Sequence, residues 1–239
     1  MTDSIAPSER DLSPDLDALR SQLDSDSEKT QLQAIAALAT AGEEGSDLLM
    51  EFLLSRKSHP PTPVEGEAYK SLYTANSPKT TAFLQDHFPK GVVPLDSDSA
   101  VDYFPVQQEL VRENFQTADR LTLEKLCELA GPRSRQRNWL YFSEVERFPT
   151  TDLQTLDTLW RIHSLGQFGY SVQRQIWLGT GKNWDKFWPK IGWRSGRTWT
   201  RYPDGFTWNL EAPAGHLPLS NQLRGRRVIE ALFNHPAWK

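Results

Sequence analysis

The chain has 239 residues, of which 38% are hydrophobic and 24% are charged, so it can form one large or two small domains and is not a highly charged, disordered type. Its single cysteine, Cys127, excludes an internal disulfide framework and a cysteine-cluster metal site. A net charge of -4 argues against a general nucleic-acid coat protein, and no run approaches the ~18 apolar residues of a membrane-spanning helix.

Charge and tryptophan are unevenly distributed along the chain. Residues 1–100 hold 8 Lys and Arg against 17 Asp and Glu, whereas residues 101–239 hold 19 against 14. All nine tryptophans lie beyond residue 138. Two such different halves are more typical of two domains than of one mixed core. We therefore predict an N-terminal helical bundle over 1–88, a linker over 89–101, where Pro, Gly, Ser and Asp dominate, and a C-terminal domain over 102–239.

The N-terminal half has the pattern of short helices. Ser13 before Pro14 predicts an N-cap and a first helical residue, Gly42 predicts a helix end, and Ser46 with Asp47 predicts another cap. The helices expected here span 15–23, 27–41, 48–54, 64–75 and 78–87, with a proline-rich loop at 58–63. The pattern fits a plain helical bundle and a truncated stack of HEAT-type repeats about equally well.

The C-terminal half is also predicted to be helical. Thr117 is expected to cap the second helix there, and Thr150 or Thr151 the third. The helices expected in this half cover 102–115, 118–129, a stretch from about 150, 170–178, 183–189 and 219–234, with a basic loop at 133–138 and an apolar element opening at 139. The fold class predicted for the whole chain is therefore all-α.

Residues 192–216 stand apart because they show little periodicity over 25 residues. A loop this long in a compact domain is usually functional or disordered, and large aromatic side chains argue against disorder. The aromatic residues of this segment are Trp193, Trp199, Tyr202, Phe206 and Trp208, and its arginines are Arg194, Arg197 and Arg201. Either the segment packs on its own domain, or it presents aromatic and cationic groups to a flat, conjugated, anionic partner.

A family resemblance lies in the stretch from Asp152 to Trp177, which reads DLQTLDTLWRIHSLGQFGYSVQRQIW. Together with Gly192-Trp193 and Gly215-His216-Leu217-Pro218, it resembles the genomes-uncoupled-four family of porphyrin-binding regulators of magnesium chelatase. The resemblance covers roughly residues 101–235, and Tyr170 stands where a phenylalanine is common. The acidic segment in front resembles the extra N-terminal bundle of cyanobacterial members.

The resemblance implies a C-terminal, all-helical domain shaped like a cupped hand, with a long loop. It implies binding of protoporphyrin IX and Mg-protoporphyrin IX, and stimulation of magnesium chelatase in chlorophyll synthesis through the large porphyrin-binding subunit of that enzyme. The chain itself is then a non-catalytic carrier and regulator without a metal site of its own. We expect a cytoplasmic monomer, and peripheral association with thylakoid or envelope-type membranes is compatible with the family.

The resemblance also implies three groups of porphyrin-binding residues. Trp193, Trp199 and Phe206 would cover the macrocycle. Asn221, Arg224 and Arg227, spaced by three residues on the last predicted helix, would line one rim of the pocket and meet the propionates. The apolar floor would consist of Leu140, Phe142, Val145, Leu153 and Ile176.

Structural alternatives accompany these assignments. Trp160, Phe168 and Trp177 lie on periodic segments and are expected in the core. His216 is expected to be hydrogen-bonded rather than to ligate a chelated magnesium ion. The sequence holds no HExxH, paired CxxC or GxSxG motif, which agrees with the absence of a catalytic role. The rival function is a nucleic-acid-binding module in which the basic, aromatic loop stacks on bases.

Overall fold

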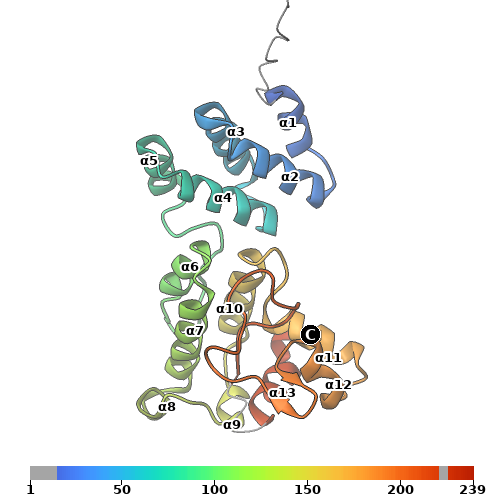
Figure 1. Ribbon diagram of the computed structural model, residues 1–239. Coiled ribbons are helices and arrows are strands. Elements are labelled where there is room, and N and C mark those ends of the chain that lie inside the picture. Colours follow the sequence, from blue (N-terminus) through green and yellow to red (C-terminus); the bar gives the residue numbers. More distant parts are fainter. Residues whose placement is uncertain (1–14, 221–225) are drawn as a thin grey trace, which may run out of the picture.

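The computed structural model describes residues 15–220 and 226–239, and within them helices dominate (Figure 1). The predicted all-α class is confirmed. Strand structure in the described residues is confined to a hairpin in which β1 (Arg194–Ser195) pairs antiparallel with β2 (Thr198–Trp199). This hairpin lies inside the segment for which the sequence predicted no regular structure.

The N-terminal part consists of five helices that pack on their sequence neighbours. They are α1 (Leu16–Leu23), α2 (Glu28–Leu38), α3 (Gly42–Arg56), α4 (Pro63–Ala75) and α5 (Pro78–His87). The cap of α1 is Asp15, whose carboxylate accepts from the backbone N–H of Ala18. Ser13 and Pro14 lie outside the described residues. Thr62 and Ser77 close capping boxes in front of α4 and α5.

The boundary between α2 and α3 corrects two predictions. Gly42 begins α3 and does not end the preceding helix, because its φ of 71° lets the chain turn between two closely spaced helices. Ser46 and Asp47 lie inside α3 and cap nothing. The Ser46 hydroxyl donates to the carbonyl oxygen of Gly42, one turn earlier in the same helix, and therefore does not cap a helix end.

The C-terminal part holds the remaining helices, which surround a second hydrophobic core. They are α6 (Phe104–Val111), α7 (Phe115–Ala130), α8 (Pro132–Arg137), α9 (Phe142–Val145), α10 (Thr150–Ile162), α11 (Tyr170–Gly179), α12 (Trp184–Lys190), α13 (Arg227–Asn234) and a short 3₁₀ helix, η2 (Pro236–Trp238). Phe115 lies in this core against Trp160, at 6.1 Å between ring centroids, and against Phe168, at 5.4 Å. The expectation that Trp160, Phe168 and Trp177 are core residues is confirmed.

Several helix ends differ from the prediction. Asn114 and not Thr117 precedes α7, because Glu113 adopts a left-handed φ of 56° that separates α6 from α7. The basic stretch 133–138, predicted to be a loop, is mostly the short helix α8, which starts at Pro132. Pro149 precedes α10, so Thr150 and Thr151 are helical residues and not caps.

The segment 89–101 forms neither helix nor strand, yet it is packed. Asp152 of α10 is fully buried and accepts hydrogen bonds from the Ser97 hydroxyl, from the backbone N–H of Asp98 at 3.0 Å and from the Tyr103 hydroxyl at 2.7 Å. Burial and the bond to Asp152 raise the pKa of Tyr103. The chain between the two helical parts is therefore anchored on α10 rather than free.

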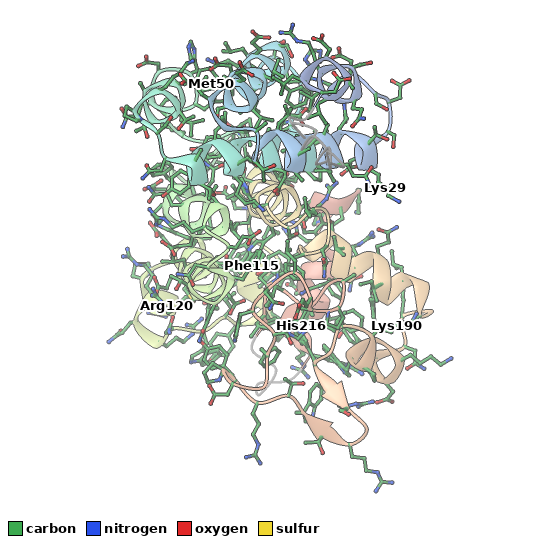
Figure 2. The ribbon with its side chains drawn as sticks, turned by 45° about the horizontal axis from the view of Figure 1, so that its top comes forward. Lys29, Met50, Phe115, Arg120, Lys190 and His216 are labelled. Atoms are coloured by element: carbon green, nitrogen blue, oxygen red, sulfur yellow. The ribbon has the colours of Figure 1, made fainter. Side chains whose placement is uncertain are left out.

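The two helical parts also meet directly through α4 and α10. A Cβ added to Gly66 of α4 would lie 2.6 Å from Cγ2 of Ile162, which shows how closely the two helices approach. An ion pair of 2.8 Å joins Lys70 of α4 to Glu113. Figure 2 shows the two parts one above the other, with Met50 in the upper part and Phe115 and His216 in the lower.

Candidate functional site

A buried hydrogen bond joins the two ends of the 192–216 segment. Trp193 is completely buried, stacks on Trp188 at 5.7 Å between ring centroids, and donates from its indole Nε1 to the carbonyl oxygen of His216 at 2.8 Å. Phe206 is 6% exposed and packs against Trp193 and His216. Trp193 and Phe206 are therefore core residues in this structure, not a surface cover.

His216 has both ring nitrogens engaged. Its Nδ1 lies 2.6 Å from the carbonyl oxygen of Ile191, to which it donates, and its Nε2 accepts from the backbone N–H of Thr207 at 3.1 Å. Burial lowers the pKa of His216, and the bond to Ile191 acts in the opposite direction. A neutral imidazole that bridges two backbone groups positions the loop, which agrees with the structural role expected from the sequence.

Trp199 is the member of the predicted cover that reaches the surface, with 42% of its area exposed. It stands on β2, and the guanidinium of Arg194 lies 5.8 Å from the centre of its ring. Tyr202, 59% exposed, meets Trp208 edge-on at 6.0 Å. Trp199 and Tyr202 thus present aromatic faces, whereas the guanidinium beside Trp199 is already paired, because Arg194 donates to the carboxylate of Asp185 at 2.9 Å.

A second aromatic and cationic surface lies on α8 and α9, which sequence reasoning did not assign as a unit. The guanidinium of Arg137 lies 4.6 Å from the ring centre of Trp139 and 4.5 Å from that of Tyr141. Glu144 bonds to Arg137 and to the backbone N–H of Tyr141; against the effect of partial burial, these bonds lower the pKa of Glu144. The carboxylate is therefore ionised and fixes Arg137 beside the two rings, which meet each other edge-on at 4.4 Å between centroids.

The start of α13 connects these surfaces. The guanidinium of Arg227 lies 5.4 Å from the ring centre of Phe142 on α9, and that of Arg226 lies 6.0 Å from Trp184 on α12. Trp184 stacks on Trp188 at 5.1 Å, and Trp188 meets Trp199 at 5.4 Å. Rings in contact therefore run from Trp184 over Trp188 to Trp199, and Arg226 and Arg227 link them to Phe142 on α9. We call this set the aromatic–arginine row.

Only some of the residues predicted to bind porphyrin lie in the aromatic–arginine row. Phe142 is 36% exposed and pairs with Arg227, as a binding role requires. Leu140, Val145 and Leu153 are buried in the core, and Ile176 is half-buried beside Gly215. Arg227 is the first residue of α13, so the helix starts later than the predicted residue 219. Asn221 and Arg224 lie outside the described residues.

A hydrogen bond from Leu219 to Asp119 fixes the chain that leads toward α13 against α7. The Asp119 carboxylate accepts from the backbone N–H of Leu219 at 2.6 Å. Burial raises the pKa of Asp119 to about 7, and the bond to Leu219 opposes that shift. The sequence analysis did not single out Asp119, Arg137, Tyr141 or Arg226 as site residues. For Arg137 and Tyr141, the alternation of arginines and aromatic residues in 135–142 was the available signal.

Comparison with known proteins now supports the resemblance. A family model described as GUN4-like matches residues 96–236, and one described as an ARM-like repeat domain, GUN4-N terminal, matches residues 8–89. The chain is 51% identical to a Ycf53-like protein of Synechocystis sp., over 95% of this chain and 98% of that one. It is 38% identical to the tetrapyrrole-binding protein, chloroplastic, of Arabidopsis thaliana, over 59% of this chain and 57% of that one.

A solved structure agrees with these matches. The structure of GUN4 from Chlamydomonas reinhardtii superimposes with a TM-score of 0.58 at 41% sequence identity, and covers 62% of this chain and 96% of its own. Of the two descriptions left open for the N-terminal helices, the repeat stack is the one that the family model supports, in its ARM-like form. The family resemblance inferred from Asp152–Trp177 is confirmed, and the chain belongs to the GUN4-like family.

Proposed function

We propose that this protein is a non-catalytic tetrapyrrole-binding regulator that binds protoporphyrin IX and Mg-protoporphyrin IX and stimulates magnesium chelatase through the large porphyrin-binding subunit of that enzyme. Family membership and the tetrapyrrole-binding relative support the ligand class. The single structural observation that carries the proposal is the aromatic–arginine row, in which Arg226 and Arg227 lie beside Trp184 and Phe142.

The chemistry of this row suits a macrocycle with two propionates. Burying about 400 Å² of apolar ring surface contributes roughly 10 kcal/mol before the entropic cost of association is subtracted. Arg226, just before α13, and Arg227, its first residue, are both exposed and can each bond to a carboxylate, as the 3.8 Å ion pair of Arg226 with Glu230 illustrates. We further propose Asn221 and Arg224 as polar contacts and Trp199 as part of the cover. Phe142 and the half-buried Ile176 would supply apolar contacts. The buried Trp193, Phe206, Leu140, Val145 and Leu153 would support the pocket from behind.

Titration of the full chain with protoporphyrin IX tests the ligand. Saturable quenching of the tryptophan fluorescence and a shift of the porphyrin Soret band are expected, because six tryptophans lie between residues 177 and 208. The matched titration with Mg-protoporphyrin IX measures which of the two is preferred. Absence of saturable quenching with both ligands would remove the proposal.

The regulatory part needs a separate assay. Adding the protein to purified magnesium chelatase subunits should raise the rate of magnesium insertion into protoporphyrin, and a pull-down with the large porphyrin-binding subunit should retain the chain. Porphyrin binding without either effect would leave a carrier and contradict the regulatory role.

We also propose that the protein is cytoplasmic and makes peripheral contact with thylakoid or envelope-type membranes. Among residues 15–220 and 226–239, none of the helices has the length and hydrophobicity of a membrane-spanning segment.

The nucleic-acid alternative rests on the exposed ring of Trp199, on which a base could stack, although the neighbouring Arg194 is paired with Asp185. It predicts binding of a single-stranded oligonucleotide with an affinity that falls steeply as salt rises. A porphyrin held mainly by apolar contact keeps much of its affinity in high salt. Parallel titrations at low and high salt therefore separate the two functions.

A further inference from the structure

The N-terminal and C-terminal parts meet where α4 lies against the end of α10. A Cβ on Gly66 of α4 would lie 2.8 Å from the carbonyl oxygen of Ile162, the last residue of α10, so the two helices touch through their backbones. Lys70 stands one turn after Gly66 on the same face of α4, and His163 directly follows Ile162. The interface therefore brings His163 against the stretch of α4 that carries Lys70.

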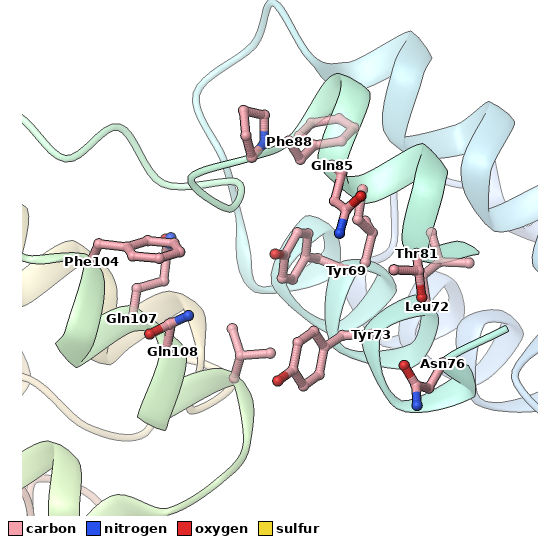
Figure 3. Close-up of a pocket in the computed structure, with 13 residues that line it drawn as sticks. Tyr69, Leu72, Tyr73, Asn76, Thr81, Gln85, Phe88, Phe104, Gln107 and Gln108 are labelled. Atoms are coloured by element: carbon pink, nitrogen blue, oxygen red, sulfur yellow. The ribbon is translucent and has the colours of Figure 1, made fainter. Parts of the chain in front are cut away.

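The contact between α4 and α6 is packed less completely. Val111, the last residue of α6, is 4% exposed and contributes to the hydrophobic core of the N-terminal part. Beside it, a hollow of about 270 Å³ is lined by Tyr69 and Tyr73 of α4 and by Phe104 of α6, and Figure 3 shows these side chains facing one another across it. A space without atoms contributes no packing attraction, so the attachment of the two parts depends more strongly on the contacts at the end of α10.

His163 is a buried ionisable side chain at this contact. It is 8% exposed, and its Nε2 is buried without a hydrogen-bond partner among the described residues. Burial, with a smaller contribution from Lys70, lowers the pKa of His163 to about 3. While the two parts are docked, the imidazole is therefore neutral at any pH well above 3, because no water or counter-charge stabilises a second hydrogen on the ring.

The charged groups around His163 oppose its protonation. Lys70 is the charged group of α4 that acts on His163. The ammonium of Lys70 lies 2.8 Å from the carboxylate of Glu67 on α4 and 2.8 Å from that of Glu113 between α6 and α7. Against the effect of burial, these two bonds raise the pKa of Lys70, which therefore stays charged. Both carboxylates are engaged by Lys70, so a proton on His163 would add a second positive charge to a buried site that already holds one.

We propose that the contact between α4 and α10 is an acid-sensitive interface, in which protonation of His163 releases the helices α1–α5 from the C-terminal part. Each part has a hydrophobic core of its own, so each stays folded after release. In the released state the imidazole lies in water and titrates near 6.5. The docked state is therefore favoured above pH 6.5 and loses stability as the pH falls. The ratio of released to docked molecules rises about 30-fold between pH 8 and pH 5.

Thiol labelling of the full chain without porphyrin tests the proposal. Val111→Cys places a thiol of similar size in the interface, whereas the natural Cys127 is 1% exposed in the C-terminal core and reports unfolding of that core in the same molecule. The labelling rate with 4,4′-dithiodipyridine, divided by the rate of an unstructured thiol peptide at the same pH, gives the fraction of molecules in which each thiol is exposed. From pH 8 to pH 5 this fraction should rise about 30-fold at position 111 and much less at Cys127. Equal rises at both thiols, or none at position 111, would overturn the proposal.

Two histidine variants in the same background assign the effect to one residue. With His163→Gln, labelling at position 111 should change by less than about threefold between pH 8 and pH 5, because glutamine takes up no proton. With His59→Gln, at an exposed position of the N-terminal part, the full rise should remain. A full rise that persists in His163→Gln would contradict the proposal. If Val111→Cys does not fold, Ile162→Cys reports the same opening from α10, and the same results decide the question.

Discussion

The indole of Trp193 donates a hydrogen bond of 2.8 Å to the carbonyl oxygen of His216, and this bond joins the two ends of the long aromatic segment. His216 in turn holds Ile191 and Thr207 through its two ring nitrogens. The segment between them therefore has a fixed base inside the core, and its exposed rings, Trp199 and Tyr202, are carried outward on that base. The bond between Trp193 and His216 thus holds Trp193 inside the core and leaves Trp199, further along the segment, at the surface.

Replacement of Trp193 tests this relationship. Trp193→Ala removes a fully buried side chain and should lower the free energy of unfolding by about 3–5 kcal/mol, since the cavity cannot collapse completely. Urea unfolding followed by circular dichroism measures the loss. Trp199→Ala, at an exposed ring, should cost much less stability. A stable Trp193→Ala variant that loses only its fluorescence response to porphyrin would show that Trp193 acts as a cover after all.

Removal of the arginines tests the proposed propionate contacts. Arg224→Ala combined with Arg227→Ala should weaken protoporphyrin binding by about 1–3 kcal/mol, or roughly 5- to 150-fold, because charge-assisted hydrogen bonds are lost. Fluorescence titration gives the dissociation constants. Arg120→Ala, on the exposed side of α7, is the control and should bind like the unmodified protein. Unchanged affinity of the double variant would mean that the propionates face solvent.

Asp152 should be essential for anchoring the segment 89–101. Asp152→Ala leaves the Tyr103 hydroxyl and the Asp98 N–H without their acceptor, and we expect a loss of about 3 kcal/mol in the free energy of unfolding. Chemical denaturation measures it. Asp98→Ala removes a nearby exposed carboxylate while keeping the backbone N–H, so it should change stability little. Equal stability of the two variants would show that the anchor contributes nothing.

His163, at the end of α10, should make the protein sensitive to acid. Burial, with a contribution from Lys70, lowers the pKa of His163 to about 3, whereas histidine in an unfolded chain titrates near 6.5. Between these values the unfolded chain binds a proton that the folded chain does not. The stability is therefore fully present above pH 6.5 and falls as the pH drops toward 3, by about 2 kcal/mol between pH 6.5 and pH 5 at 1.36 kcal/mol per pH unit.

The comparison of His163→Gln with the unmodified protein isolates this effect. Urea unfolding at pH 8, 6 and 5 should show a smaller loss of stability in acid for the variant, because glutamine does not take up a proton. His59→Gln, at an exposed position, should follow the unmodified protein. Parallel pH profiles of His163→Gln and the unmodified protein would contradict the assignment.

The helical class, most helix positions and the family could be predicted from the order of the amino acids alone. Thr62 before Pro63, and Ser77 before Pro78, mark α4 and α5 because caps and prolines act over a few residues. The stretch Asp152–Trp177 carries the family resemblance through a specific combination of residues that needs no three-dimensional information. Local signals predicted both α6 and α7 but misplaced the boundary between them, because the left-handed φ of Glu113 ends α6 at Val111 and lets α7 begin at Phe115.

Which aromatic residues face outward could not be predicted locally, because it depends on contacts between distant segments of the chain. Trp193 and Trp199 belong to the same stretch without helical periodicity, yet one is completely buried and the other is 42% exposed, because the contacts of Trp193 come from α12 and from residue 216. The pairing of Phe142 with Arg227 likewise joins residues that are far apart in the chain. The hollow lined by Tyr69, Phe88 and Phe104 likewise depends on how the N-terminal helices pack against α6, which no local pattern specifies.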